Sequence, residues 1–130
     1  MSPIKLNVKT GSQKYPIYIG KDILNKLKKF LVENSINFNQ CLVIADKNVP
    51  KKLIYRALNS LPKKKTYLHY FNSSEKNKNQ KTVNNILSIL LSKNFNRNDC
   101  VISIGGGITG DVSGFAASIF KRGLKFINIP

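Results

Sequence analysis

The stretch VISIGGGITGDVSGF, residues 101–115, places Gly105, Gly106, Gly107 and Gly110 directly after a run of apolar residues. Gly105, Gly107 and Gly110 satisfy the pattern G-x-G-x-x-G, with Gly106 as a fourth glycine, where a predicted strand (100–104) meets a predicted helix (Thr109 to Lys121). A backbone without side chains lets a phosphate approach main-chain N–H groups, and the helix start adds partial positive charge and unpaired donors. The stretch therefore predicts a phosphate-binding turn; the alternative is a tight strand-to-helix turn that binds nothing.

The sequence on both sides of this turn alternates between strand and helix patterns. Apolar and polar residues alternate at 4–8 and 15–19, which predicts two strands joined by the turn TGSQK. Apolar faces at helical spacing and short apolar runs follow in alternation. The predicted helices lie within 21–34, 49–61 and 79–93, with Asp22 favouring the first helix start, and further strands lie at 41–45, 66–71 and 124–129. The order predicts an α/β fold: a Rossmann-like parallel sheet flanked by helices, with an N-terminal strand pair.

Length and composition indicate one cytoplasmic domain. The 130 residues are 42% hydrophobic, which is enough for a core, and no apolar run is long enough for a membrane span or a signal-peptide core. Cys41 and Cys100 each begin an apolar run and lie in no CxxC motif. We expect both thiols to be reduced and buried, without a zinc site.

The chain carries a net charge of +16, almost all of it from lysine. Such a charge favours binding of polyanions or of small anionic ligands, but dispersed lysines are also typical of a solvated surface. Clustered arginines and exposed aromatic platforms would indicate nucleic-acid binding, and neither is evident. We therefore expect no nucleic-acid partner and no membrane; a basic nucleic-acid-binding module is the rival hypothesis from another class.

Acidic residues follow the predicted parallel strands. Asp46 ends the strand 41–45, Glu75 with Lys78 follows the strand 66–71, and Asp111 lies just after the glycines. Carboxyl ends of parallel strands share one edge of a sheet, so these groups are predicted to converge there around a cofactor. The dinucleotide fingerprint itself is incomplete, because no acid follows Asp111, and Asp46 is the candidate ribose partner. The alternatives are local ones: a loop cap for Asp46, a solvated pair for Glu75 and Lys78, and dipole compensation for Asp111.

Two further side chains are candidates for a functional site. Arg122 is one of three arginines, and its planar guanidinium suits bidentate recognition of carboxylate or phosphate, although a surface role stays open. His69 is the only histidine, within a predicted strand, and one histidine alone makes neither a metal site nor a catalytic triad.

The segments YPIYIG, ADKNV, Glu75-x-x-Lys78, GGGITGDVSGFAAS and KRGLKFINIP occur in this order along essentially the whole chain. Together they resemble the N-terminal domain of 3-dehydroquinate synthase, most specifically between residues 105 and 130. The wider superfamily of sugar-phosphate cyclases and polyol dehydrogenases shares the glycine turn. Thr109 departs from the family pattern, where a branched apolar residue is commoner.

The resemblance implies NAD as cofactor and assigns residues to it. Asp46, Asn48, Glu75 and Lys78 would contact the ribose and adenosine side of NAD. The glycine turn, with Gly105, Gly106, Gly107 and the amide of Ile108, would hold the pyrophosphate, and Asp111 would reach the nicotinamide side. Arg122 would bind the anionic groups of the substrate.

The resemblance also implies an enzymatic activity, and part of the family's catalytic machinery has no counterpart in residues 1–130. The family converts 3-deoxy-D-arabino-heptulosonate 7-phosphate to 3-dehydroquinate and phosphate, using NAD and a divalent metal, zinc or cobalt, and is usually dimeric. The family's metal ligands lie in a helical C-terminal domain that has no counterpart in residues 1–130. We therefore expect residues 1–130 to be a truncated NAD-binding domain, inactive alone. The rivals are another cyclase or a polyol dehydrogenase of the superfamily, and an α/β module that binds nothing.

Overall fold

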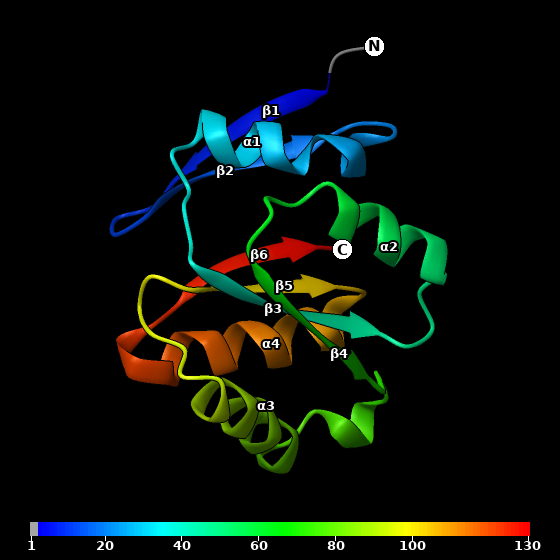
Figure 1. Ribbon diagram of the computed structural model, residues 1–130, viewed down its shortest axis with the longest axis vertical. Coiled ribbons are helices and arrows are strands. Elements are labelled where there is room, and N and C mark those ends of the chain that lie inside the picture. Colours follow the sequence, from blue (N-terminus) through cyan, green and yellow to red (C-terminus); the bar gives the residue numbers. More distant parts are fainter. Residues whose placement is uncertain (1–2) are drawn as a thin grey trace.

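The computed structural model describes residues 3–130 and has the predicted α/β architecture (Figure 1). A two-stranded antiparallel sheet precedes a four-stranded parallel sheet with the strand order β4-β3-β5-β6. The strands are β1 (Ile4–Lys9), β2 (Lys14–Ile19), β3 (Gln40–Asp46), β4 (Lys65–Phe71), β5 (Cys100–Ile104) and β6 (Lys125–Ile129). The helices are α1 (Leu27–Glu33), α2 (Lys51–Asn59), α3 (Gln80–Ser92) and α4 (Gly107–Ile119), with 3-10 turns at Ile23–Lys26, Glu75–Asn77 and Phe120–Arg122.

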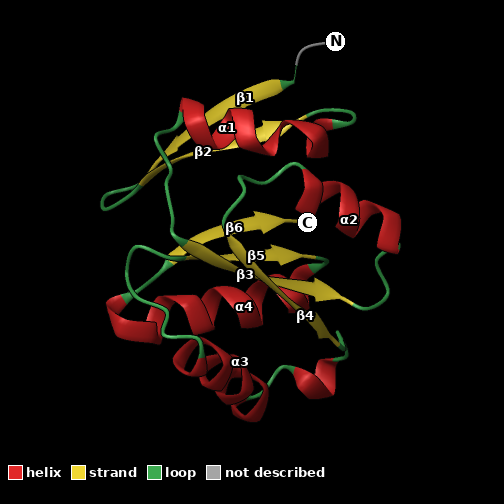
Figure 2. Ribbon diagram, in the orientation of Figure 1, coloured by secondary structure: helices red, strands yellow, loops and turns green. Residues whose placement is uncertain are grey.

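Helices cover both faces of the parallel sheet, as Figure 2 shows. On one face, α3 and α4 pack through Ile86, Leu90 and Ala116 onto Leu42 and Val101 of the two central strands. On the other face, the region of α1 and α2 packs onto alternate residues of the same strands. Strands β3 and β5 are therefore largely apolar because both of their faces are covered.

The order of the strands creates a switch point between β3 and β5. From β3 the chain crosses through α2 to β4 on one side, and then returns through α3 to β5 on the other side. Adjacent connections leave β3 and β5 in opposite directions, and open α/β sheets commonly bind ligands at the carboxyl ends of two such strands. Asp46 ends β3 and Gly105 follows β5, so both residues lie at this switch point.

The two cysteines are buried, as predicted. Cys41 and Cys100 are register partners on β3 and β5, and both thiols are fully shielded from solvent. Burial raises the pKa of each thiol, which keeps both protonated and unreactive. Their role is packing in the core, and no cluster of three metal-binding side chains occurs among residues 3–130.

Two local predictions need correction. The helix after the glycines begins at Gly107 rather than Thr109 and ends at Ile119. Asp22 does precede the first helical turn, but its backbone is left-handed (φ 55°) and its side chain makes no capping hydrogen bond. That turn is a short 3-10 segment, and the α-helix proper starts only at Leu27.

The N-terminal hairpin packs through the face that carries its polar positions. Tyr18 stacks on Phe30 of α1 at 3.8 Å between ring centroids, and its hydroxyl donates to Glu33 at 3.0 Å. The opposite face holds the register pairs Ile4–Ile19 and Leu6–Ile17, which are largely exposed. No helix within residues 3–130 has both the length and the hydropathy that a membrane crossing requires.

Candidate functional site

The glycines of the turn serve different purposes. Gly105 has φ +151°, and a Cβ on it would lie 2.9 Å from Cβ of Asp46 and 3.0 Å from Oγ1 of Thr109. The fold itself therefore requires glycine at 105. A Cβ on Gly106 or Gly107 would meet no atom within 4 Å, and neither residue has a positive φ. No contact among residues 3–130 requires glycine at these two positions, so the space beside them is free for a ligand.

The start of α4 offers main-chain donors beside this free space. Gly106 is the N-cap residue, and no side chain caps the helix. The first amide groups of an α-helix have no partner within the helix, and the helix dipole favours an anion there. Both Gly106 and Gly107 are exposed, so an anion can approach these amides from solvent. The side chain of Ile108 packs against the core, and its main-chain amide is part of the glycine turn.

Two hydrogen bonds hold the side chain of Asp46 at the switch point between β3 and β5. Its Oδ1 accepts from the main-chain N–H of Asn48 at 2.9 Å, and its Oδ2 accepts from the hydroxyl of Ser73 at 2.5 Å. The loop after β3 is thereby tied to the loop after β4. Asp46 therefore has the capping role that the sequence left open as an alternative. Each of its carboxylate oxygens keeps a further lone pair, with which it can accept a hydrogen bond from a sugar hydroxyl.

Lys78 and Asp111 form an ion pair at the same edge of the sheet. Lys78 Nζ lies 3.0 Å from Oδ2 of Asp111, and both side chains are about half exposed. This contact joins the loop before α3 to the first turns of α4. The hydrogen bond and charge of Asp111 are the main cause of a raised pKa at Lys78, and the charge of Glu75 adds to it. The structure therefore brings Lys78, Asp111 and Glu75 together, and their contact with a cofactor stays a prediction.

Replacement of Asp111 with asparagine should lower the pKa of Lys78 toward its ordinary value of 10.5. A raised lysine pKa stabilises the fold at pH values below the unfolded pKa, and the contribution is lost as the pH rises through the folded pKa. Because the pair is exposed, the expected change in stability is small. An NMR titration of the Lys78 side chain in both proteins measures the shift; an identical pKa in the variant would contradict the ion pair.

Arg122 lies away from these residues. It follows α4 at the amino edge of the sheet, while the glycine turn precedes α4 at the carboxyl edge. Thirteen residues of α-helix separate the two positions by about 20 Å. Within one copy of residues 3–130, Arg122 does not join the site formed by Asp46, the glycines and Asp111. Its predicted substrate contact stays a prediction.

His69 lies half-buried in β4, and burial lowers its pKa. It joins no group of metal-binding side chains among the described residues. Thr109 was noted in the sequence only as a departure from a pattern. It is fully buried against Gly105, and its hydroxyl has no hydrogen-bond partner among residues 3–130. A polar residue two positions after a glycine turn could have signalled this contact.

The fold and the site together define a doubly wound α/β domain with an exposed glycine turn at its switch point. The family described as 3-dehydroquinate synthase N-terminal matches residues 68–130. The whole chain is 69% identical to 3-dehydroquinate synthase of Pelagibacter ubique and covers 35% of that protein. Over 98% of the chain, it is 37% identical to 3-dehydroquinate synthase of Blochmanniella floridana, again covering 35%. The predicted resemblance is confirmed: the chain is similar to 3-dehydroquinate synthases and spans about a third of the length of these relatives.

Solved structures agree on the fold. A 2-deoxy-scyllo-inosose synthase complexed with carbaglucose-6-phosphate, NAD⁺ and Co²⁺ superposes with a TM-score of 0.88 at 24% identity, over 98% of this chain and 35% of that one. The 2-epi-5-epi-valiolone synthase of Streptomyces hygroscopicus, with NAD⁺ and Zn²⁺ bound, gives a TM-score of 0.75 at 19% identity, over 95% and 34%. These likenesses support the α/β architecture.

Proposed function

We propose that residues 1–130 form the NAD-binding domain of a 3-dehydroquinate synthase. The reaction would convert 3-deoxy-D-arabino-heptulosonate 7-phosphate to 3-dehydroquinate and phosphate in the cytoplasm. The chain spans about a third of the length of the relatives it matches, so the activity would belong to a longer polypeptide. The identity of 69% to one such synthase favours this activity over the other sugar-phosphate cyclases and polyol dehydrogenases, whose structures are less than 25% identical.

The observation that carries the proposal is the free space at Gly106 and Gly107. Glycine within the first turn of a helix, as at Gly107, costs stability relative to alanine, and no contact among residues 3–130 calls for glycine at 106 or 107. A pyrophosphate accepting from the amides of Gly106, Gly107 and Ile108 accounts for both residues. A pyrophosphate would therefore reach these amides without meeting a side chain at positions 106 and 107.

The remaining predicted residues would hold the rest of the cofactor. Asp46 would accept from a ribose hydroxyl through its unused lone pairs, with Asn48 exposed beside it. Glu75 and Lys78 would border the adenosine side, and Asp111 the nicotinamide side. When bound, NAD would supply transient oxidation of a substrate hydroxyl. The chain's part is to orient the dinucleotide on the sheet edge.

Residues 3–130 do not fit the divalent metal of the family. No group of three histidine, cysteine, aspartate or glutamate side chains is placed to hold an ion within this part of the chain. Zinc or cobalt would have to bind elsewhere in the longer polypeptide. Arg122, at the far edge of the sheet, would likewise reach a substrate only in the longer polypeptide or in a homodimer.

A calorimetric titration with NAD tests the proposal. The longest polypeptide that the gene encodes should bind NAD, and with a divalent metal it should release phosphate from the seven-carbon substrate. Residues 1–130 alone should release none, because they hold no metal-binding cluster among the described positions. Turnover by residues 1–130, or absence of NAD binding by the longest form, would refute the assignment.

A further inference from the structure

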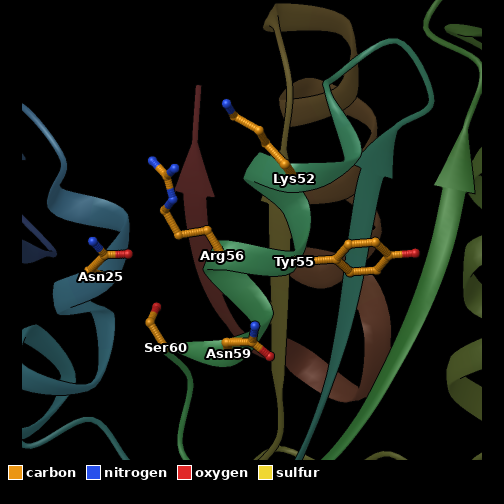
Figure 3. A pocket seen from close by; sticks show the side chains of 6 residues that line it. All are labelled: Asn25, Lys52, Tyr55, Arg56, Asn59 and Ser60. Atoms are coloured by element: carbon orange, nitrogen blue, oxygen red, sulfur yellow. The ribbon is translucent and has the colours of Figure 1, made fainter.

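A groove on the outer side of α2 lies apart from the glycine turn (Figure 3). It runs between α2 and the 3-10 turn Ile23–Lys26, on the sheet face opposite α3 and α4. Its volume is about 560 Å³. The residues that line this α2 groove are Asn25, Lys52, Tyr55, Arg56, Asn59 and Ser60.

The groove is positively charged and holds no carboxylate. Lys52 and Arg56 are one helical turn apart, and Figure 3 shows both side chains directed to the side of α2 that faces Asn25. Neither takes part in an ion pair with the described residues, where Lys78–Asp111 is the pair formed. Arg56 is half-buried all the same. A partly desolvated guanidinium without a counter-ion is unfavourable, so an external anion would be stabilised there.

The walls of the groove are held at a fixed separation. The hydroxyl of Ser60, at the end of α2, donates to the main-chain oxygen of Leu24. The main-chain N–H of Lys28 donates to the oxygen of Ser60 at 3.0 Å. These bonds join α2 to the segment that carries Asn25, so the two walls of the groove are connected before any ligand arrives. Such preorganisation lowers the entropic cost of binding.

We propose that the α2 groove binds the phosphate group of a small phosphorylated molecule. A phosphate monoester carries nearly two negative charges at pH 7, which match one lysine and one arginine. The guanidinium can donate two parallel hydrogen bonds to phosphate oxygens, and the carboxamide of Asn25 adds a neutral donor. The groove is wide open to solvent, so an organic part attached to the phosphate can extend along it.

Calorimetric titration of the longest encoded polypeptide with glucose 6-phosphate tests the proposal, with glucose and glucuronate as comparison ligands. Arg56→Ala should weaken the binding of glucose 6-phosphate about tenfold or more. Arg97→Ala is the matched control, since it removes the same charge from an exposed loop before β5 and should change affinity less than about twofold. Arg56→Lys keeps the charge without the planar fork and should fall between the two.

Each outcome decides the proposal. Equal weakening by Arg56→Ala and Arg97→Ala would show only the general positive field of the chain, and would overturn it. Glucuronate binding as tightly as glucose 6-phosphate, or absence of heat with the latter, would overturn it too. Thermal unfolding of each variant checks that the fold is kept, and Arg56→Lys provides the answer if Arg56→Ala unfolds. NAD affinity should be unchanged in Arg56→Ala, so failure here leaves the NAD proposal standing.

Discussion

Gly107→Ala should weaken NAD binding about tenfold or more while leaving the thermal stability equal to that of the wild type or slightly higher. The Cβ of alanine would stand in the space beside the first amides of α4, where the pyrophosphate is proposed to lie. The same methyl group meets no protein atom within 4 Å. Alanine also favours helix over glycine by up to about 1 kcal/mol, less at a helix end.

Opposite effects on ligand and fold make this substitution informative. Calorimetry with NAD gives the affinity, and thermal unfolding gives the stability. Gly11→Ala is the matched control, because a Cβ on Gly11 in the hairpin turn also meets open space and lies far from the site. Unchanged NAD affinity in Gly107→Ala would remove the main support for a pyrophosphate at this turn.

Gly105→Ala should destabilise the fold by about 2–3 kcal/mol, the largest stability change expected for a glycine of the turn. The backbone at φ +151° is one that side-chain-bearing residues rarely adopt. The new methyl group would also press against Asp46 and Thr109, which are both buried. Asp46 would have to move, and its hydrogen bonds to Asn48 and Ser73 would be distorted.

Chemical denaturation measures this change, and Gly106→Ala provides the comparison one residue along the chain. Gly106 has an ordinary backbone and free space, so its replacement should cost less than about 1 kcal/mol. Similar losses of stability in the two variants would show that neither φ nor the contact with Asp46 governs the requirement for glycine at 105.

The sequence predicts the fold well because the apolar spacing of its helices differs clearly from the short apolar runs of its strands. The apolar runs of β3 and β5 predict parallel strands covered on both faces, and the structure confirms this. The start of α4 was placed two residues too late, since glycine has low helix propensity and hides the first helical turn at Gly107. Likewise, an acid at Asp22 predicts a helix start but cannot reveal a left-handed backbone.

The sequence predicts the site only in part, because contacts between loops leave no periodic signal. The positions of Asp46, Glu75 and Asp111 follow from their places after parallel strands. The bond from Ser73 to Asp46 joins two loops that are 27 residues apart, and no spacing rule indicates it. The helix predicted from Thr109 to Lys121 is long enough to place Arg122 at the opposite edge of the sheet, so its length was a usable signal that Arg122 lies away from the glycine turn. Lys52 and Arg56 were missed, although their helical spacing without a nearby acid was a usable signal.

The ion pair between Lys78 and Asp111 should affect how the proposed NAD affinity depends on salt concentration. Both side chains are proposed to touch the dinucleotide, yet they neutralise each other across 3.0 Å. Added salt weakens an exposed pair of this kind and releases both groups for the ligand. The same ions screen the attraction between the lysine-rich surface and the diphosphate. These opposing influences should flatten the dependence of cofactor affinity on ionic strength, in spite of a net charge of +16.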